Sequence, residues 1–356
     1  MGTLEPGRAF WERSSKLNDY GTDLALELLP YFTDGRIQSM EGLYFESSAT
    51  TPFHFLTAAE VAKEPSNPVR GLSYRTIADF NLGVRHLRLL GVRYFMAASD
   101  EAKAVADAHP DMSLVAETGS PEVAPKVARW RIYEVANSDL VEPLAFEPVV
   151  MKPVVAPGEW LSPSADWFND PGAIDRHLAA SGPSDWARVA TAGAAYAPRR
   201  ELPRVEVDSI QSGKDEISFR VSRPGVPILV KTSYFPNWKA KGALGPYRVT
   251  PNFMVVVPTE REVSLFYSRT PVDLAGLGLS LGGLAGLVLL ARRWPRRGEP
   301  ASASPDGRAP TEEPGADRVS LTRADEESAA LTGSAPLPGA PTSVGPGTAG
   351  GPGTAR

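Results

Sequence analysis

Histidine and cysteine are the first side chains to inspect for chemistry, because imidazoles and thiolates bind metals and act as bases or nucleophiles near neutral pH. The chain contains no cysteine, which excludes disulfides, thiolate metal sites and cysteine nucleophiles. No two of its four histidines have the spacing of a zinc-binding helix motif; they are His54, His86, His109 and His177. We expect them on the surface or in loops, and we expect no metal site and no cofactor.

Carboxylate pairs are the next candidates, because two nearby carboxyl groups can serve as general acid and general base. Three pairs stand close in the sequence: Asp19 with Asp23, Glu41 with Glu46, and Asp166 with Asp170. Each pair also fits turn or capping roles, and a chain with 42 acidic residues contains such pairs by chance. Neither a phosphate-binding P-loop nor a GxSxG nucleophile elbow is present. We therefore expect no catalytic residue in this chain.

The segment from Glu41 to Phe55 mixes aromatic side chains with serine and threonine, a composition typical of loops that bind polar ligands. Its candidate ligand contacts are Glu46, Ser48 and His54. The alternative is a long loop packed by its own aromatic residues, and we favour that alternative.

A second candidate is the aromatic pair Tyr234 and Trp238, which flanks Pro236. If exposed, the two rings could stack on sugars or lie among lipid headgroups, where tyrosine and tryptophan are enriched. If buried, they would fill the core of a β-domain. We favour the buried interpretation for at least one of them.

One apolar segment is long enough to cross a membrane. From Leu274 to Ala291 it contains no charged residue, and its 18 residues would rise about 27 Å as a helix. Gly278, Gly282 and Gly286 recur every fourth residue, a stripe that lets another membrane helix approach closely. We therefore expect a lipid bilayer and other transmembrane helices as partners.

The charges beside this segment predict its orientation. Basic clusters stay on the cytoplasmic side, and four arginines follow the segment: Arg292, Arg293, Arg296 and Arg297. The N-terminal region would then lie outside the cell membrane and the C-terminal tail in the cytoplasm. Because the N-terminus lacks an apolar signal sequence, we expect upstream membrane helices in a larger polytopic protein. The alternative is a tail anchor that leaves the N-terminal region in the cytoplasm.

The predicted fold class is α+β. Residues 1–150 read as a small α/β module with its helices on one face of a sheet. Its expected elements are helices at 24–29, 79–90 and 101–109, the last capped by Asp100, and strands at 92–96, 114–117 and 129–135. Residues 151–200 form a connector rich in proline and tryptophan, with one helix at 171–180 capped by Asp170.

The sequence pattern of the C-terminal half predicts an antiparallel β-sandwich that is followed by a membrane anchor. Within residues 201–273, apolar residues alternate in five expected strands at 205–208, 217–222, 228–230, 253–257 and 263–267. The transmembrane helix occupies 274–291. Residues 292–356 form a basic flank and a disordered tail, which has no aromatic residue after residue 297. The net charge of −5 gives no reason to expect nucleic acid as a partner.

Two stretches together resemble the C-terminal end of YfhO-like and related GT-C-type bacterial membrane proteins. The first is SYFPNWKAKG with the later VVVPTEREVSLFYSRTPVD, and the second is LRLLGVRYFMAAS with ARWRIYEV. A further stretch, GTDLALELLPYFTDGRIQSMEGLYFESS, is similar to large actinobacterial envelope proteins of this kind. The resemblance covers residues 8–297.

The resemblance implies an extracytoplasmic module that leads into a last membrane helix. GT-C enzymes carry their catalytic carboxylate beside their first membrane helices, which this sequence lacks, so no catalytic residue is carried over. We expect a non-catalytic extracytoplasmic and membrane-anchoring portion of such a protein, linked to envelope glycan or lipid-linked sugar. The alternative is a stand-alone membrane-anchored binding or scaffold protein. A hydrolase on a stalk is disfavoured, because the chain lacks nucleophile and metal motifs.

Overall fold

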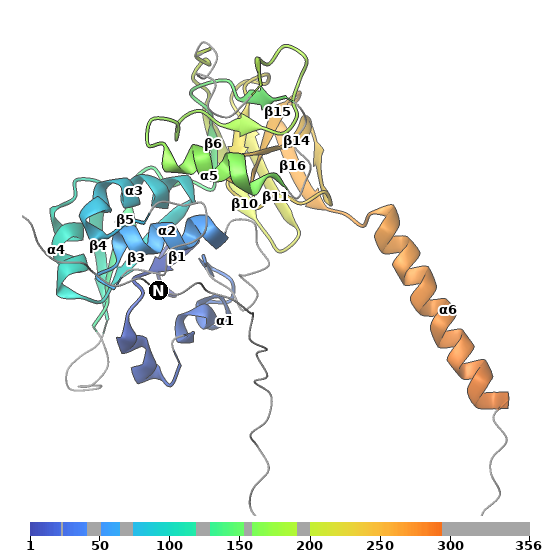
Figure 1. Cartoon of the computed structure of the whole chain (residues 1–356), viewed down its shortest axis with the longest axis horizontal. Coiled ribbons are helices and arrows are strands. Elements are labelled where there is room, and N and C mark those ends of the chain that lie inside the picture. Colours follow the sequence, from blue (N-terminus) through green and yellow to red (C-terminus); the bar gives the residue numbers. More distant parts are fainter. Residues whose placement is uncertain are drawn as a thin grey trace, which may run out of the picture. The chain divides into compact units, whose positions relative to one another are not determined.

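Three β-sheets organise the described part of the chain. The computed structural model describes residues 1–22, 24–40, 51–64, 74–118, 129–152, 159–190 and 200–293. Residues 1–291 belong to one unit, which Figure 1 shows coloured along the sequence. The C-terminal unit begins at Arg292, and only its first two residues are described.

The N-terminal sheet has five strands in the order β2-β1-β3-β5-β4. Strand β1 pairs in parallel with β2 and β3, whereas β5 runs antiparallel to β3 and β4. The strands are β1 (Gly7–Trp11), β2 (Ile37–Ser39), β3 (Val92–Ala97), β4 (Met112–Glu117) and β5 (Arg131–Val135). The three strands predicted in this region are confirmed, whereas β1 and β2 were not predicted.

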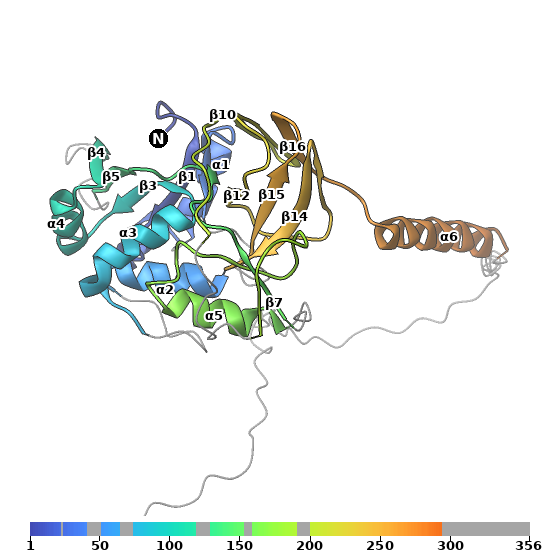
Figure 2. The same ribbon diagram turned by 90° about the horizontal axis from the view of Figure 1, so that it is seen from above.

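Three helices cover one face of this sheet: α2 (Thr51–Val61), α3 (Phe80–Leu89) and α4 (Asp100–Ala108). Figure 2 shows α2 and α3 side by side beneath the strands. Phe53 of α2 and Val84 of α3 belong to the same buried cluster as Phe10 and Phe95 of the sheet. The other face is covered by η1 (Ser15–Tyr20), η2 (Ala25–Leu28) and the short α1 (Leu29–Phe32).

The helices predicted at 79–90 and 101–109 are confirmed, with one correction at a cap. The backbone N–H of Ala102 donates to Oγ of Ser99 at 3.1 Å, so Ser99 is the N-cap of α4. Asp100, predicted as the cap, is the first helical residue, where its negative charge still favours the helix dipole. The helix predicted at 24–29 is a 3-10 turn that continues into α1.

The helix predicted at 171–180 is wrong. Helix α5 spans Leu161–Asn169, because Trp167 and Phe168 follow Ser164 at spacings that place all three on one buried face. Asp170 accepts a hydrogen bond from the backbone N–H of Gly172 at 2.9 Å and so forms a turn. Asp170 therefore lies at the end of helix α5, whereas we predicted that it lies at the start of a helix.

A seven-stranded sheet forms the middle of the unit, in the order β6-β12-β15-β14-β8-β7-β9. Its neighbours are antiparallel, except that β7 runs parallel to β8 and β9. The strands are β6 (Val141–Pro143), β7 (Val149–Met151), β8 (Leu178–Ala179), β9 (Arg188–Val189), β12 (Ile228–Val230), β14 (Ala243–Val249) and β15 (Phe253–Pro258). Four of these strands come from residues before 200.

The third sheet is antiparallel and has the order β10-β11-β16-β13. Its strands are β10 (Val207–Ser212), β11 (Glu216–Val221), β13 (Trp238–Lys241) and β16 (Glu262–Tyr267). Met254 and Val256 of β15 pack against this sheet, whereas Phe253 and Val255 face the cluster that contains Trp160. Alternation along one strand therefore places the seven-stranded sheet between two cores. Two packed sheets are present, but they are not confined to residues 201–273 as predicted, because β7, β8 and β9 come from the segment around the expected connector and β7 pairs in parallel.

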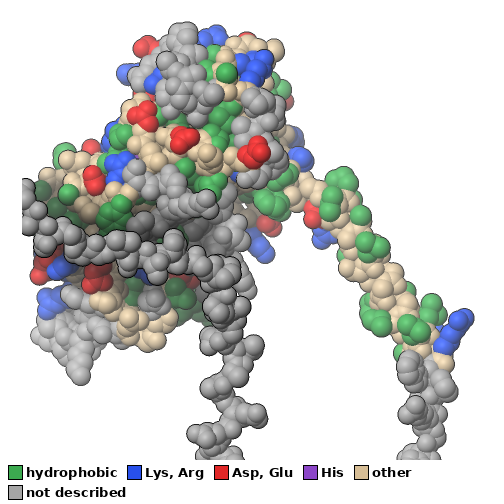
Figure 3. Space-filling view, viewed as in Figure 1, with side chains coloured by type: hydrophobic (Ala, Val, Ile, Leu, Met, Phe, Trp, Pro, Cys, Tyr) green, Lys and Arg blue, Asp and Glu red, His purple; other side chains and the backbone are tan. Residues whose placement is uncertain are grey.

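Helix α6 spans Pro271–Arg293 and is long and apolar enough to cross a membrane. The structure buries none of its residues, and Figure 3 shows hydrophobic side chains and backbone along it, with basic side chains at its end. The predicted membrane segment is therefore a helix that extends three residues upstream of Leu274 and two downstream of Ala291. The predicted disordered tail, with Arg296 and Arg297, lies outside the described residues.

Candidate functional site

The first predicted ligand segment does not form a binding loop in its described part. Glu46 and Ser48 lie outside the described residues. His54 lies within α2, is only 3% exposed and has its ring 5.0 Å from the ring of Phe10. Pro52 at the second position of α2 favours a helix start there, because its fixed φ suits the first turn. His54 is therefore a core residue and not a loop contact.

The expectation of surface histidines is wrong for His86 and His177 as well. His86 Nδ1 lies 2.6 Å from Oε2 of Glu60, and both side chains are buried between α2 and α3. His177 Nδ1 hydrogen-bonds the backbone oxygen of Thr250 at 2.7 Å. Burial lowers the pKa of His177 to about 4, which keeps it neutral at physiological pH. Within the described residues, no three histidine or acidic side chains gather as metal ligands would.

A buried carboxylate occupies the carboxyl edge of the parallel strands, where α/β sheets commonly bind ligands. Glu12 follows β1 and accepts hydrogen bonds from the backbone N–H groups of Ala98 and Ser99, each at 2.7 Å. It also accepts from Ser99 Oγ at 2.5 Å and from the Lys63 backbone N–H at 3.2 Å. The residue is 1% exposed. Both carboxylate oxygens of Glu12 therefore accept hydrogen bonds that connect the end of β1 to the start of α4, and the role of this residue is structural.

Both aromatic residues of the predicted pair in the segment 234–238 pack on the sandwich core. Trp238 is 8% exposed and packs in the sandwich core, as we favoured for at least one of the two. Tyr234 is half-buried against the same core, with the Arg248 guanidinium 5.8 Å from its ring. Phe235 between them is 54% exposed and stacks on Tyr267 at 6.1 Å between ring centroids. The exposed aromatic surface is therefore Phe235 with Tyr267, and not the predicted pair.

The same segment is joined to the start of α6. The side chain of Asn237 donates to Oδ2 of Asp273 at 3.0 Å, and its backbone oxygen accepts from the N–H of Ser268 at 2.9 Å. Thr270 and Asp273 form a capping box: Thr270 N donates to Asp273 Oδ2 at 2.6 Å, and Asp273 N donates to Thr270 Oγ1 at 3.3 Å. These hydrogen bonds fix the first turn of α6 against the segment 234–238.

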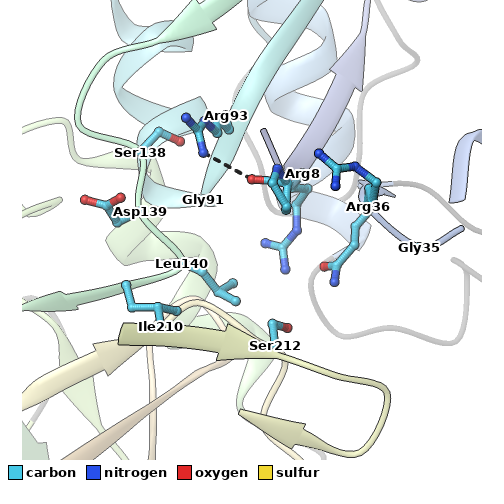
Figure 4. A pocket seen from close by; sticks show the side chains of 13 residues that line it. Arg8, Gly35, Arg36, Gly91, Arg93, Ser138, Asp139, Leu140, Ile210 and Ser212 are labelled. Atoms are coloured by element: carbon cyan, nitrogen blue, oxygen red, sulfur yellow. Dashed lines mark hydrogen bonds between the residues drawn. The ribbon is translucent and has the colours of Figure 1, made fainter. Parts of the chain in front are cut away.

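A cavity of about 250 Å³ lies at the opposite edge of the N-terminal sheet, where its parallel strands begin. Arg8 is the second residue of β1, Arg93 is the second residue of β3, and Arg36 directly precedes β2. Figure 4 shows these three arginines on one side of the cavity, with Leu140, Ile210 and Ser212 on the other. We call this cavity the arginine pocket.

The three arginines differ in how their charge is balanced. Arg93 pairs with Glu134 at 2.9 Å. Arg8 Nη1 donates to the backbone oxygens of Leu90 at 2.5 Å and Lys231 at 3.1 Å, and Arg36 Nη2 donates to that of Leu4 at 2.9 Å.

Neither Arg8 nor Arg36 forms an ion pair with any residue that the structure describes. Burial lowers the pKa of Arg8 to about 10, so it stays protonated at neutral pH.

A second cationic side chain, that of Lys231, lies close to Arg8, whose Nη1 donates to the Lys231 backbone oxygen. Lys231 is 1% exposed, and its Nζ donates to Glu142 at 2.8 Å and to the backbone oxygen of Arg88 at 2.7 Å. Burial lowers the pKa of Lys231, and Glu142 opposes that shift. The Lys231–Glu142 pair therefore adds little net charge to the pocket but holds Arg8 in place through the Lys231 carbonyl.

Two glycines leave room for basic side chains of this region to pack against the backbone. A Cβ at Gly7 would meet Cδ of Arg93 at 2.8 Å, which is closer than carbon atoms pack. Gly91 has a φ of +66°, and a Cβ there would meet Cδ of Lys231 at 3.3 Å. The sequence carries a signal of this pocket that our sequence analysis missed, because a glycine precedes an arginine by one or two residues at each parallel strand.

Comparison of the chain with protein-family models, with curated proteins and with solved structures gives no match.

Proposed function

We propose that this chain is the extracytoplasmic and membrane-anchoring portion of a GT-C-like integral membrane protein that handles envelope glycan or lipid-linked sugar. In this proposal the chain itself is not catalytic. The observation that carries its anchoring part is the junction of Asn237 with Asp273, because it joins the sandwich directly to the capped start of an apolar helix. The glycan link rests on the resemblance of the segments around that junction.

The surface of α6 supports a partner in the membrane. A Cβ built on Gly278, Gly282 or Gly286 would meet no atom within 4 Å among the described residues. Small residues at this spacing favour close helix packing within a bilayer. Tyr267, which is exposed beside the junction and stacked on Phe235, is of a residue type that favours the headgroup region.

The orientation is tested by labelling. Because the chain has no cysteine, Lys214→Cys on the exposed turn between β10 and β11 provides a single reactive thiol. In intact cells a membrane-impermeant maleimide should label this variant, and a reporter fused after Arg356 should read cytoplasmic. If the thiol is labelled only after cell lysis and the reporter lies outside the cell, the orientation is the opposite one. That result would support the tail-anchor alternative.

Partner helices are tested by crosslinking in native membranes. Gly282→Cys lies on the glycine stripe, whereas Leu284→Cys lies on another side of α6, since two residues turn a helix by about 200°. A thiol crosslinker should join Gly282→Cys, and not Leu284→Cys, to a different integral membrane protein. Absence of any such product would favour the stand-alone binding protein, the alternative for which the arginine pocket is the supporting observation.

A further inference from the structure

We propose that the arginine pocket is a binding site for the phosphoryl group of a phosphate monoester. The proposal is independent of the topology and of the membrane partners proposed above. It rests on three arginines that converge on one cavity, two of them in the adjacent strands β1 and β3 and the third directly before β2.

The charge of the lining favours an anion. Three guanidinium groups and one carboxylate, that of the exposed Asp139, line the cavity. Arg93 is already paired with Glu134, but Arg8 and Arg36 have no carboxylate partner among the described residues. Arg8 is half-buried, and a half-buried guanidinium without a counter-ion is unfavourable. An anion between Arg8 and the exposed Arg36 would balance both charges.

The donor geometry favours an oxyanion over a halide. Each guanidinium presents five N–H groups in a planar fork that matches two oxygens of a phosphoryl group. Only Nη1 of Arg8 and Nη2 of Arg36 are used by the backbone oxygens named above. The remaining N–H groups of both side chains are left for a ligand. Arginine is protonated throughout the neutral range, so such a site would not depend on pH there.

The frame around the arginines is fixed before any ligand arrives. Arg8 and Arg93 belong to strands, and Arg8 is held by hydrogen bonds to two separate backbone segments. Gly7 provides the space that Arg93 occupies. Donors that are already positioned lose less entropy when an anion binds.

The size and the far wall of the pocket indicate which kind of phosphate fits. About 250 Å³ admits a phosphoryl group with a small attached moiety. Leu140 and Ile210 face the arginines across the cavity, so the carbon skeleton of an ester would contact apolar side chains. A phosphorylated sugar and the headgroup of a phosphatidic-acid lipid share this chemistry.

The test is calorimetric titration of the full chain in detergent with glucose 1-phosphate and with inorganic phosphate, at constant ionic strength in chloride. Both probes should bind, the ester more tightly. Arg36→Gln should weaken binding about tenfold or more, because it removes a charge-assisted contact. Arg8→Lys keeps the charge but loses the fork, and should weaken binding as well. Arg36 is exposed, so its variant should fold even if that of Arg8 does not.

Arg223→Gln is the matched control, because Arg223 is exposed and does not line the pocket. It should change the affinity less than twofold. Equal weakening by Arg223→Gln and Arg36→Gln would overturn the proposal in favour of diffuse charge attraction. The proposal would also be overturned if neither glucose 1-phosphate nor inorganic phosphate gave binding heat at concentrations on the order of 10 mM.

Nanodiscs distinguish the two sources of the phosphate. If discs that contain phosphatidic acid suppress glucose 1-phosphate binding relative to phosphatidylcholine discs, and Arg36→Gln removes the difference, the lipid headgroup occupies the pocket. If the two discs give equal binding, the ligand is soluble. Both results support the site.

Discussion

The side chain of Asn237 donates to Oδ2 of Asp273 at 3.0 Å, and this contact joins the β-sandwich to the first turn of α6, the helix that is long and apolar enough to cross a membrane. The same carboxylate oxygen accepts the backbone N–H of Thr270 at 2.6 Å. One carboxylate therefore caps α6 and holds it to the segment 234–238.

This junction should control protease access to the linker before α6. Trypsin can cleave after the exposed Arg269, which stands directly before the capping box. Asn237→Ala removes the side-chain contact to Asp273, so the linker should open more often and cleavage after Arg269 should become severalfold faster. Gln211→Ala on β10 is a control that should leave the rate unchanged. Equal rates in the wild type and Asn237→Ala would show that the contact does not hold the linker.

The sandwich core should depend on Trp238 and not on its exposed neighbour. Trp238→Ala should lower the free energy of unfolding by about 3 kcal/mol or more, because it empties a large buried volume. Phe235→Ala should change it by less than about 1 kcal/mol, because that ring is 54% exposed. Denaturant unfolding of both variants in the same detergent checks this. A large loss with Phe235→Ala would place its ring in a packed contact.

Stability should fall as the pH drops from 6.5 to about 4, and His177 should account for part of the fall. The folded protein keeps His177 neutral down to a pKa of about 4, whereas the unfolded chain takes up its proton near 6.5. The unfolded state therefore binds more protons in this range, which costs about 3 kcal/mol of stability by pH 4.

His177→Gln keeps an N–H group for Thr250 but cannot titrate. Its unfolding free energy should depend less on pH between 6.5 and 4 than that of the wild type. Denaturant titrations at three pH values measure both slopes. Identical slopes would mean that His177 is exposed to protons in the folded state.

The buried carboxylate of Glu12 should contribute strongly to stability. Glu12→Ala leaves the N–H groups of Ala98, Ser99 and Lys63 without their acceptor. We expect a loss of about 3 kcal/mol or more, since each unsatisfied buried donor costs about 1–3 kcal/mol. Glu117→Ala, which removes a half-exposed surface carboxylate, should cost less than about 1 kcal/mol. Thermal unfolding of the two variants gives the comparison.

Local sequence patterns predicted those elements whose stability is largely local. Phe80, Val84 and Leu87 recur at helical spacing, and α3 forms there. The apolar run from Leu274 to Ala291 predicted α6, because its composition and length suffice without any distant partner. Helix α5 was missed because Trp167 was assigned to a connector, although Ser164, Trp167 and Phe168 carry the helical period.

The sequence by itself determined the α+β class, the membrane-length helix and the alternating strands of the sandwich, because each depends on periodicity or composition within a few residues. Only the tertiary structure decided the rest. Strands β8 and β9 have two residues each, too few to show a period, and exist through pairing with β7. The arginine pocket joins residues more than 200 positions apart. The glycine before each of its arginines is a local signal, but the convergence of the three arginines on one cavity arises from sheet pairing.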